Sequence, residues 1–199
     1  MRRLEKIRAT APAKANIRID YNQALSPIEA ARCCRDMEQF SLGFIEQPVA
    51  AQHWDCMAEL ARNLATPLLA DESVFTPEQA LAAAGRRIAD AFSVKLMKAG
   101  GLLPAQSIAA IAEAGGIACY AGTLWEGAIG LAAGAHFVAA TPAVTLGCEF
   151  YMPRYVFDPT QCEATLDVAD GRVQVPTGPG LGIDVDEDVL DSITTERLT

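Results

Sequence analysis

The sequence predicts an α/β fold: an incomplete TIM-type (β/α) barrel of about six βα units, followed by a C-terminal hairpin and tail. Short apolar runs alternate with segments of helical periodicity, which is the pattern of consecutive βα units with parallel strands. Four successive runs also end in an ionisable residue, and barrel enzymes build their sites from the C-terminal ends of several strands. A doubly wound sheet is the alternative, but the chain has no GxGxxG or GxxxxGKS phosphate turn.

The predicted strands are the apolar runs, which are almost continuously hydrophobic because parallel strands are covered on both faces. The first four end at ionisable residues: Asp20, Glu46, Asp71 and Lys95. These residues are 26, 25 and 24 positions apart, and two further runs, 116–120 and 143–147, continue the series. The regular interval leaves room for one helix after each strand.

Serine or threonine followed by proline begins two of the predicted helices. The hydroxyl can cap the first turn, and proline fits the first helical position because its missing N–H is not needed there. These helices are predicted to extend to residues 39 and 84, after the Ser26-Pro27 and Thr76-Pro77 pairs. Two more helices are expected over 53–65 and 105–114, the latter ending at a Gly-Gly pair.

The C-terminal part departs from the βα pattern. Two short alternating runs flank Asp170-Gly171, which predicts a β-hairpin with a two-residue turn. A glycine- and proline-rich loop and an acidic end follow. We therefore expect a partial barrel domain over 1–162 and a tail over 163–199.

Composition excludes several classes of protein. Sixteen Lys and Arg against 25 Asp and Glu give a net charge of −9, which argues against nucleic acid as a partner. No apolar run is long enough to span a bilayer, and the first residues do not form a signal peptide. The six cysteines show no CxxC spacing and are interpreted as reduced thiols of a cytoplasmic protein.

Asp20, Glu46 and Asp71 are expected to converge, because the ends of neighbouring barrel strands face one small volume. Three carboxylates at close range repel each other unless a cation compensates them, and hard oxygen ligands suit Mg²⁺ or Mn²⁺. For each acid taken alone, the alternative is a helix cap or a solvated loop residue. Glu72, beside Asp71, either orients a metal ligand or is simply exposed.

Lys95 ends the fourth run in the same register as the three acids. It is therefore predicted to face the same volume, as an acid/base group or an electrostatic clamp. The alternative is a surface lysine at a strand end. Lys98, three residues later, either reaches inward or lies in solvent.

Five blocks in order resemble the enolase superfamily, in its muconate-lactonizing branch: IRIDYNQ, FIEQP, ADESV, VKLMKAGG and YAGTLWEGAIG. The resemblance extends from Ile17 to Ile183. It implies that the acids Asp20, Glu46 and Asp71 bind a divalent metal and that Lys95 is an acid/base or electrostatic group. The GTLWEG block resembles GTxxEG of the cycloisomerases, which implies that Glu126 is a catalytic proton donor. The alternative is that Glu126 is a charge at a helix N-terminus, where the helix dipole favours an acid.

The resemblance implies a muconate or chloromuconate cycloisomerase that uses Mn²⁺ or Mg²⁺. Such an enzyme closes cis,cis-muconate, a small dicarboxylate, to a lactone through a metal-stabilised enediolate in the catabolism of aromatic compounds. A dipeptide or N-acylamino-acid epimerase, which moves one α-proton between two lysines, is the alternative enzyme. A non-catalytic remnant or subunit is the alternative from another class.

The sequence departs from the family in two respects. Relatives carry a KxK motif about one βα unit before the first metal ligand, and an N-terminal cap domain; neither is present before Asp20. We therefore expect a truncated form that is a homo-oligomer or associates with the missing N-terminal portion. Alone it is expected to be poorly soluble or oligomeric, because the strand ending at Asp20 would lack a neighbour. It is also expected to be inactive, because the KxK lysine that delivers the proton in relatives is missing.

Overall fold

The computed structural model describes residues 2–150, 164 and 166–195, which belong to two compact units. The first unit comprises Met1–Ser93 and Ala110–Cys119, and the second comprises Val94–Ala109 and Tyr120–Thr199. The predicted boundary between 162 and 163, like Cys162, lies outside the described residues.

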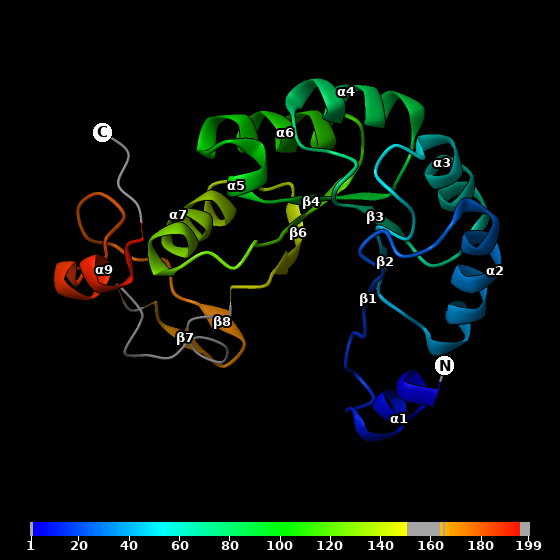
Figure 1. Ribbon diagram of the computed structural model, residues 1–199, viewed down its shortest axis with the longest axis horizontal. Helices are drawn as coiled ribbons and strands as arrows, with labels where there is room; N and C mark the ends of the chain where they lie inside the picture. Colours follow the sequence, from blue (N-terminus) through cyan, green and yellow to red (C-terminus); the bar gives the residue numbers. More distant parts are fainter. Residues whose placement is uncertain (1, 151–163, 165, 196–199) are drawn as a thin grey trace. The chain divides into compact units, whose positions relative to one another are not determined.

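A six-stranded sheet is formed by the described residues, with its strands in chain order (Figure 1). The strands are β1 (Ile19–Asp20), β2 (Ile45–Glu46), β3 (Leu68–Ala70), β4 (Ala91–Val94), β5 (Ala118–Ala121) and β6 (Val144–Cys148). The pairs β1–β2, β2–β3 and β3–β4 are parallel. A doubly wound sheet reverses its strand order at a switch point, whereas this order never reverses, as in a barrel. The predicted succession of βα units is confirmed.

Helices lie between the strands of this sheet and near both ends of the described chain. They are α1 (Arg2–Thr10), α2 (Pro27–Met37), α3 (Trp54–Asn63), α4 (Pro77–Arg86), α5 (Leu96–Ala99), α6 (Leu102–Ala114), α7 (Ala128–Ala139) and α9 (Glu187–Ile193), with a 3₁₀ turn at Glu38–Phe40 after α2. The start of α4 is the predicted cap, in which Thr76 Oγ1 accepts the backbone N–H of Gln79. At α2, Ser26 and Glu29 form the corresponding capping box.

The core of the first unit is built from its strands. Ile45, Leu68, Leu69 and Phe92 have no exposed surface, as the almost continuous apolar runs predict. Helices α2 and α3 contact each other, and α3 contacts β3 (Figure 1). The strand ends are therefore anchored in a packed interior.

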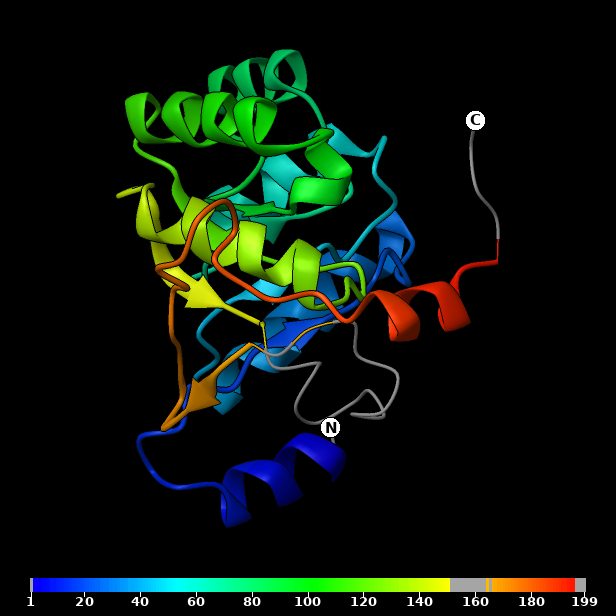
Figure 2. The same cartoon turned by 90° about the vertical axis from the view of Figure 1, so that its left-hand side faces the viewer.

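The second unit has its own core around α7. Leu131, Ala132 and Ala135 of α7 pack with Phe150 and Leu166. The predicted hairpin is confirmed as the antiparallel pair β7 (Val168–Ala169) and β8 (Arg172–Val173), with positive φ at both turn residues. Figure 2 shows the segment after β8 crossing α7, where Leu181 and Ile183 contact this core.

No helix in the described ranges is long and apolar enough to cross a membrane.

Candidate metal and acid–base site

The three predicted metal ligands lie at the ends of consecutive strands of the first unit. Asp20 of β1 is the register partner of Glu46 of β2, and Glu46 in turn pairs with Leu69 of β3. Asp71 is two positions beyond Leu69. Because successive side chains alternate between the faces of a strand, this register assigns all three carboxylates to one face of the sheet.

The three acids differ in their surroundings. Asp71 and Glu46 are buried, with 3% and 8% of their surface exposed. Asp20 is exposed and is held by its neighbour Asn22, which donates its backbone N–H to Oδ1 and its side-chain Nδ2 to Oδ2, both at 2.7 Å. The local loop after β1 therefore orients the Asp20 carboxylate.

The pKa of Glu72 responds to the neighbouring acids. Burial raises the pKa of its carboxyl above the ordinary value, and repulsion from Asp71 and Asp20 raises it further, while a hydrogen bond from Gln23 opposes the shift. Its Oε2 atom is buried without a hydrogen-bond partner among the described residues. Acids from two strand ends are thus within electrostatic range of each other.

This chemistry fits a divalent cation. The donor set consists of hard carboxylate oxygens on one sheet face, and the orphaned Glu72 oxygen beside them is an acceptor that lacks a positive partner. Within the ranges that the structure describes, no three His, Cys, Asp or Glu side chains are gathered closely enough to hold an ion. Joint coordination by Asp20, Glu46 and Asp71 stays a prediction.

Lys95 and Glu126 belong to the second unit. Lys95 follows β4 directly, is the N-cap of α5 and is buried, with 8% of its surface exposed. Glu126 lies in the loop between β5 and α7, and its Oε2 accepts the backbone N–H of Leu124. Their approach to the three acids of the first unit stays a prediction.

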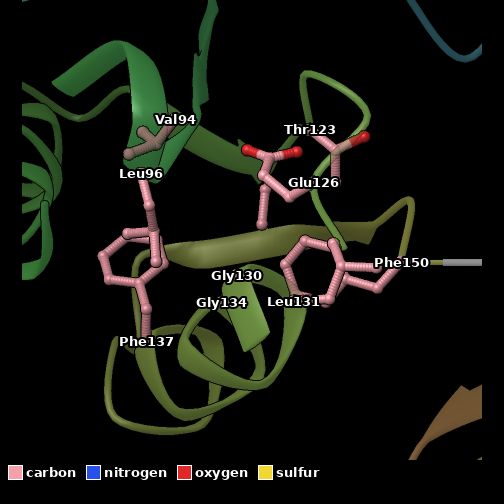
Figure 3. Close-up of a pocket in the computed structure, with 11 residues that line it drawn as sticks. Val94, Leu96, Thr123, Glu126, Gly130, Leu131, Gly134, Phe137 and Phe150 are labelled. Atoms are coloured by element: carbon pink, nitrogen blue, oxygen red, sulfur yellow. The ribbon is translucent and has the colours of Figure 1, made fainter. Parts of the chain in front are cut away.

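A small pocket lies beside Glu126, within the second unit (Figure 3). Two glycines of α7 leave room for the side chains of Glu126 and Phe150, which line it. A Cβ atom at Gly130 would lie 2.8 Å from Glu126 Cβ, and one at Gly134 would lie 2.8 Å from Phe150 Cζ. No role was predicted for either glycine, although their spacing of four places them on one helix face.

Comparison with known proteins identifies the family of this chain. Residues 1–189 match the family model described as enolase C-terminal domain-like. Muconate cycloisomerase 1 of Rhodococcus opacus is 37% identical over 192 residues, which are 96% of this chain and 51% of that protein. L-Ala-D/L-Glu epimerase of Bacillus subtilis is 37% identical over 190 residues, covering 91% of this chain and 50% of that protein.

A solved structure agrees with these matches. The crystal structure of a muconate cycloisomerase from Azorhizobium caulinodans superposes with a TM-score of 0.84 at 48% identity, covering 96% of this chain and 54% of that one. The chain thus spans about half the length of the relatives it matches. The predicted fold class, a partial TIM-type barrel of the enolase superfamily, is confirmed. The chain belongs to the enolase C-terminal domain-like family.

Proposed function

We propose that this chain forms the metal-binding part of a muconate or chloromuconate cycloisomerase, an isomerase that closes cis,cis-muconate or a substituted muconate to a lactone. The observation that supports the proposal is the strand register, which predicts a common face for Asp20, Glu46 and Asp71, in a chain of this family. The relatives named as cycloisomerases support the substrate class, a small dicarboxylate. A cytoplasmic location is supported by Cys33, Cys34, Cys56 and Cys119, which are free thiols.

Asp20, Glu46 and Asp71 would hold Mn²⁺ or Mg²⁺. The bound cation supplies Lewis-acid stabilisation of the negative charge that develops on a substrate carboxylate. The protein fixes the carboxylate oxygens that would bind the cation. Asn22 orients Asp20, and burial keeps bulk water from competing for Glu46 and Asp71. A fixed donor set of this kind needs little reorganisation during the reaction.

Lys95 would attract the negatively charged substrate, and Glu126 would donate a proton. Lactone closure joins a carboxylate oxygen to one carbon of a conjugated double bond and adds a proton to another carbon. A buried ammonium at the end of β4 can attract the dianionic substrate, and the Glu126 carboxyl can donate a proton. The Leu124 N–H on Glu126 Oε2 holds that carboxyl in one orientation.

A dipeptide epimerase is the second candidate. It is supported by the 37% identity to L-Ala-D/L-Glu epimerase of Bacillus subtilis, which equals the identity to muconate cycloisomerase 1. Moving an α-proton from one face to the other needs an acid/base group on each side of the substrate. Lys95 supplies one such group. The GTLWEG block, with its acidic residue Glu126, favours the cycloisomerase.

The test is a chimera that joins the N-terminal half of muconate cycloisomerase 1 of Rhodococcus opacus to this chain. We expect Mn²⁺-dependent loss of the diene absorbance of cis,cis-muconate, abolished by Glu46→Gln and by Lys95→Met. The same preparations are offered L-Ala-L-Glu. Epimerisation of the dipeptide without lactone formation would contradict the proposal and establish the second candidate.

A further inference from the structure

Gln47 is a fully buried amide side chain that lies between two of the proposed metal ligands. It follows Glu46 directly at the end of β2, has no exposed surface, and is among the largest fully buried side chains of the described residues. Its backbone φ of 30° lies in the left-handed region, which a residue other than glycine adopts at a cost. Such a residue needs strong local interactions to hold it.

The side-chain amide of Gln47 uses its whole hydrogen-bonding capacity. Nε2 donates to Val49 O and to Ser73 Oγ, both at 2.9 Å. Oε1 accepts the backbone N–H of Asp71 at 2.9 Å and that of Ser73 at 3.2 Å. Two donors and two lone pairs are therefore all satisfied, and a flipped amide would place its NH₂ group against two N–H donors.

The backbone of Gln47 extends these connections to the first strand. Its carbonyl oxygen accepts the N–H of Gln23, in the loop after Asp20, at 2.8 Å, and its own N–H donates to Leu69 of β3 at 3.0 Å. One residue thus touches the chain segments that carry each of the three acids. The segment from Asp71 to Ser73 meets the side chain, and the Glu46 end is attached covalently.

We propose that Gln47 is a positioning residue, which sets the backbone of Glu46 and Asp71 in place before a cation binds. The inference rests on the proposed metal-dependent function and deepens it. Gln47 itself is not proposed to touch the metal or the substrate. Groups that orient metal ligands typically change metal affinity by about 10- to 100-fold when they are removed.

The direct test is Gln47→Met, which keeps the length of the side chain and removes the amide. Mn²⁺ binding to the purified chain is followed by electron paramagnetic resonance of the free ion, and folding by denaturant unfolding in EDTA. We expect the dissociation constant for Mn²⁺ to rise by about 10- to 100-fold.

Gln79→Met is the matched control. Gln79 Oε1 also accepts two backbone N–H groups, those of Phe75 and Thr76, but it lies exposed at the start of α4. It is expected to bind Mn²⁺ as the unsubstituted protein does, even where it is less stable. A merely structural role of Gln47 would make the two variants alike in Mn²⁺ affinity.

The outcomes separate the two proposals. If the unsubstituted protein binds no Mn²⁺, the proposed metal function is overturned, and the inference falls with it. If that protein binds Mn²⁺ and a folded Gln47→Met variant binds it equally well, the inference alone is overturned.

A measurement on the unsubstituted protein covers the case in which Gln47→Met does not fold. In EDTA, the amide protons of Asp71 and Ser73 are expected to exchange with solvent more slowly than those of Phe75 and Thr76. Equal rates in EDTA, with slowing at Asp71 and Ser73 only after Mn²⁺ is added, would show that the cation orders this segment, and would overturn the inference.

Discussion

The backbone N–H of Thr123 donates to Glu149 Oε1 at 2.8 Å, so a carboxylate just after β6 holds the loop that carries Glu126. The other oxygen of Glu149 accepts the hydroxyl of Tyr120 at 3.4 Å. Both contacts lie in the second unit. They attach the loop after β5 to the next strand of the sheet.

Glu149→Leu is expected to lower the free energy of unfolding by about 1–3 kcal/mol, because a partly buried N–H loses a charged acceptor. Glu149→Gln keeps an acceptor oxygen and should lose less. Urea unfolding of the two variants measures the difference. Equal losses of unfolding free energy in the two variants would mean that a hydrogen bond from Thr123 to an oxygen at this position does not stabilise the protein.

Gly134→Ala is expected to destabilise the protein by about 1–3 kcal/mol, because its new Cβ would press on the packed Phe150 ring. Gly85, near the end of α4, is the control. A Cβ there would meet nothing within 4 Å, so Gly85→Ala should stabilise the protein by about 0.5–1 kcal/mol. Thermal unfolding of the two variants should therefore shift in opposite directions.

Mn²⁺ is expected to raise the melting temperature, since a ligand that binds only the folded state stabilises it by mass action. Glu46→Gln should abolish this rise. It should change the metal-free stability little or raise it, because one of several mutually repelling anions is removed. Glu113→Gln, an exposed acid of α6, should leave the rise intact. An undiminished rise in Glu46→Gln would place the ion elsewhere.

Cys33 and Cys34 are neighbours on α2 with different surroundings. Burial raises the pKa of the Cys34 thiol to about 12, from an ordinary value of 9.0, whereas Cys33 is partly exposed. At pH 8, iodoacetamide is expected to label Cys33 in the folded protein and Cys34 only after unfolding, which peptide mass spectrometry can follow. Rapid labelling of Cys34 under native conditions would contradict its burial.

The same shift has a consequence for stability at alkaline pH. Because the folded state keeps the Cys34 proton at a pH where the unfolded state releases it, the thiol's contribution is complete below pH 9 and is lost as pH rises towards 12. The free energy of unfolding should therefore fall less steeply above pH 9 in Cys34→Ala than in the unsubstituted protein. Parallel pH profiles would contradict the raised pKa.

Features with a local cause were predictable from the sequence. The βα alternation follows from hydrophobic periodicity, and the start of α4 from the Thr76-Pro77 pair, because hydrophobic spacing and caps act over a few residues. Helix α6 begins at Leu102, earlier than predicted, since Pro104 is tolerated inside a first turn, where its N–H is not needed. The bounds of helix α7 were not predicted, because it is apolar on all sides and shows no amphipathic pattern.

Features that depend on distant contacts were not predictable in this way. The Gln47 side chain is held by a hydrogen bond to Ser73, which is 26 residues away, and Gly134 is required by its contact with the Phe150 ring. The FIEQP motif therefore predicted a role for Glu46 but none for the neighbouring Gln47. The strand ends of Asp20, Glu46 and Asp71 could be predicted because periodicity alone places them, whereas their coordination depends on side-chain positions.

The strand order also bears on how the chain folds. Because the strands pair in chain order, bringing Asp20 beside Glu46 closes a short loop, and the later pairings close loops of similar length. The entropic cost of closure grows with loop length, so these steps are relatively easy. The contact between His136 Nε2 and Leu181 O spans 45 residues. Such a contact forms more readily once α7 has folded. The C-terminal segment is therefore expected to pack against α7 late in folding and to hold it in place.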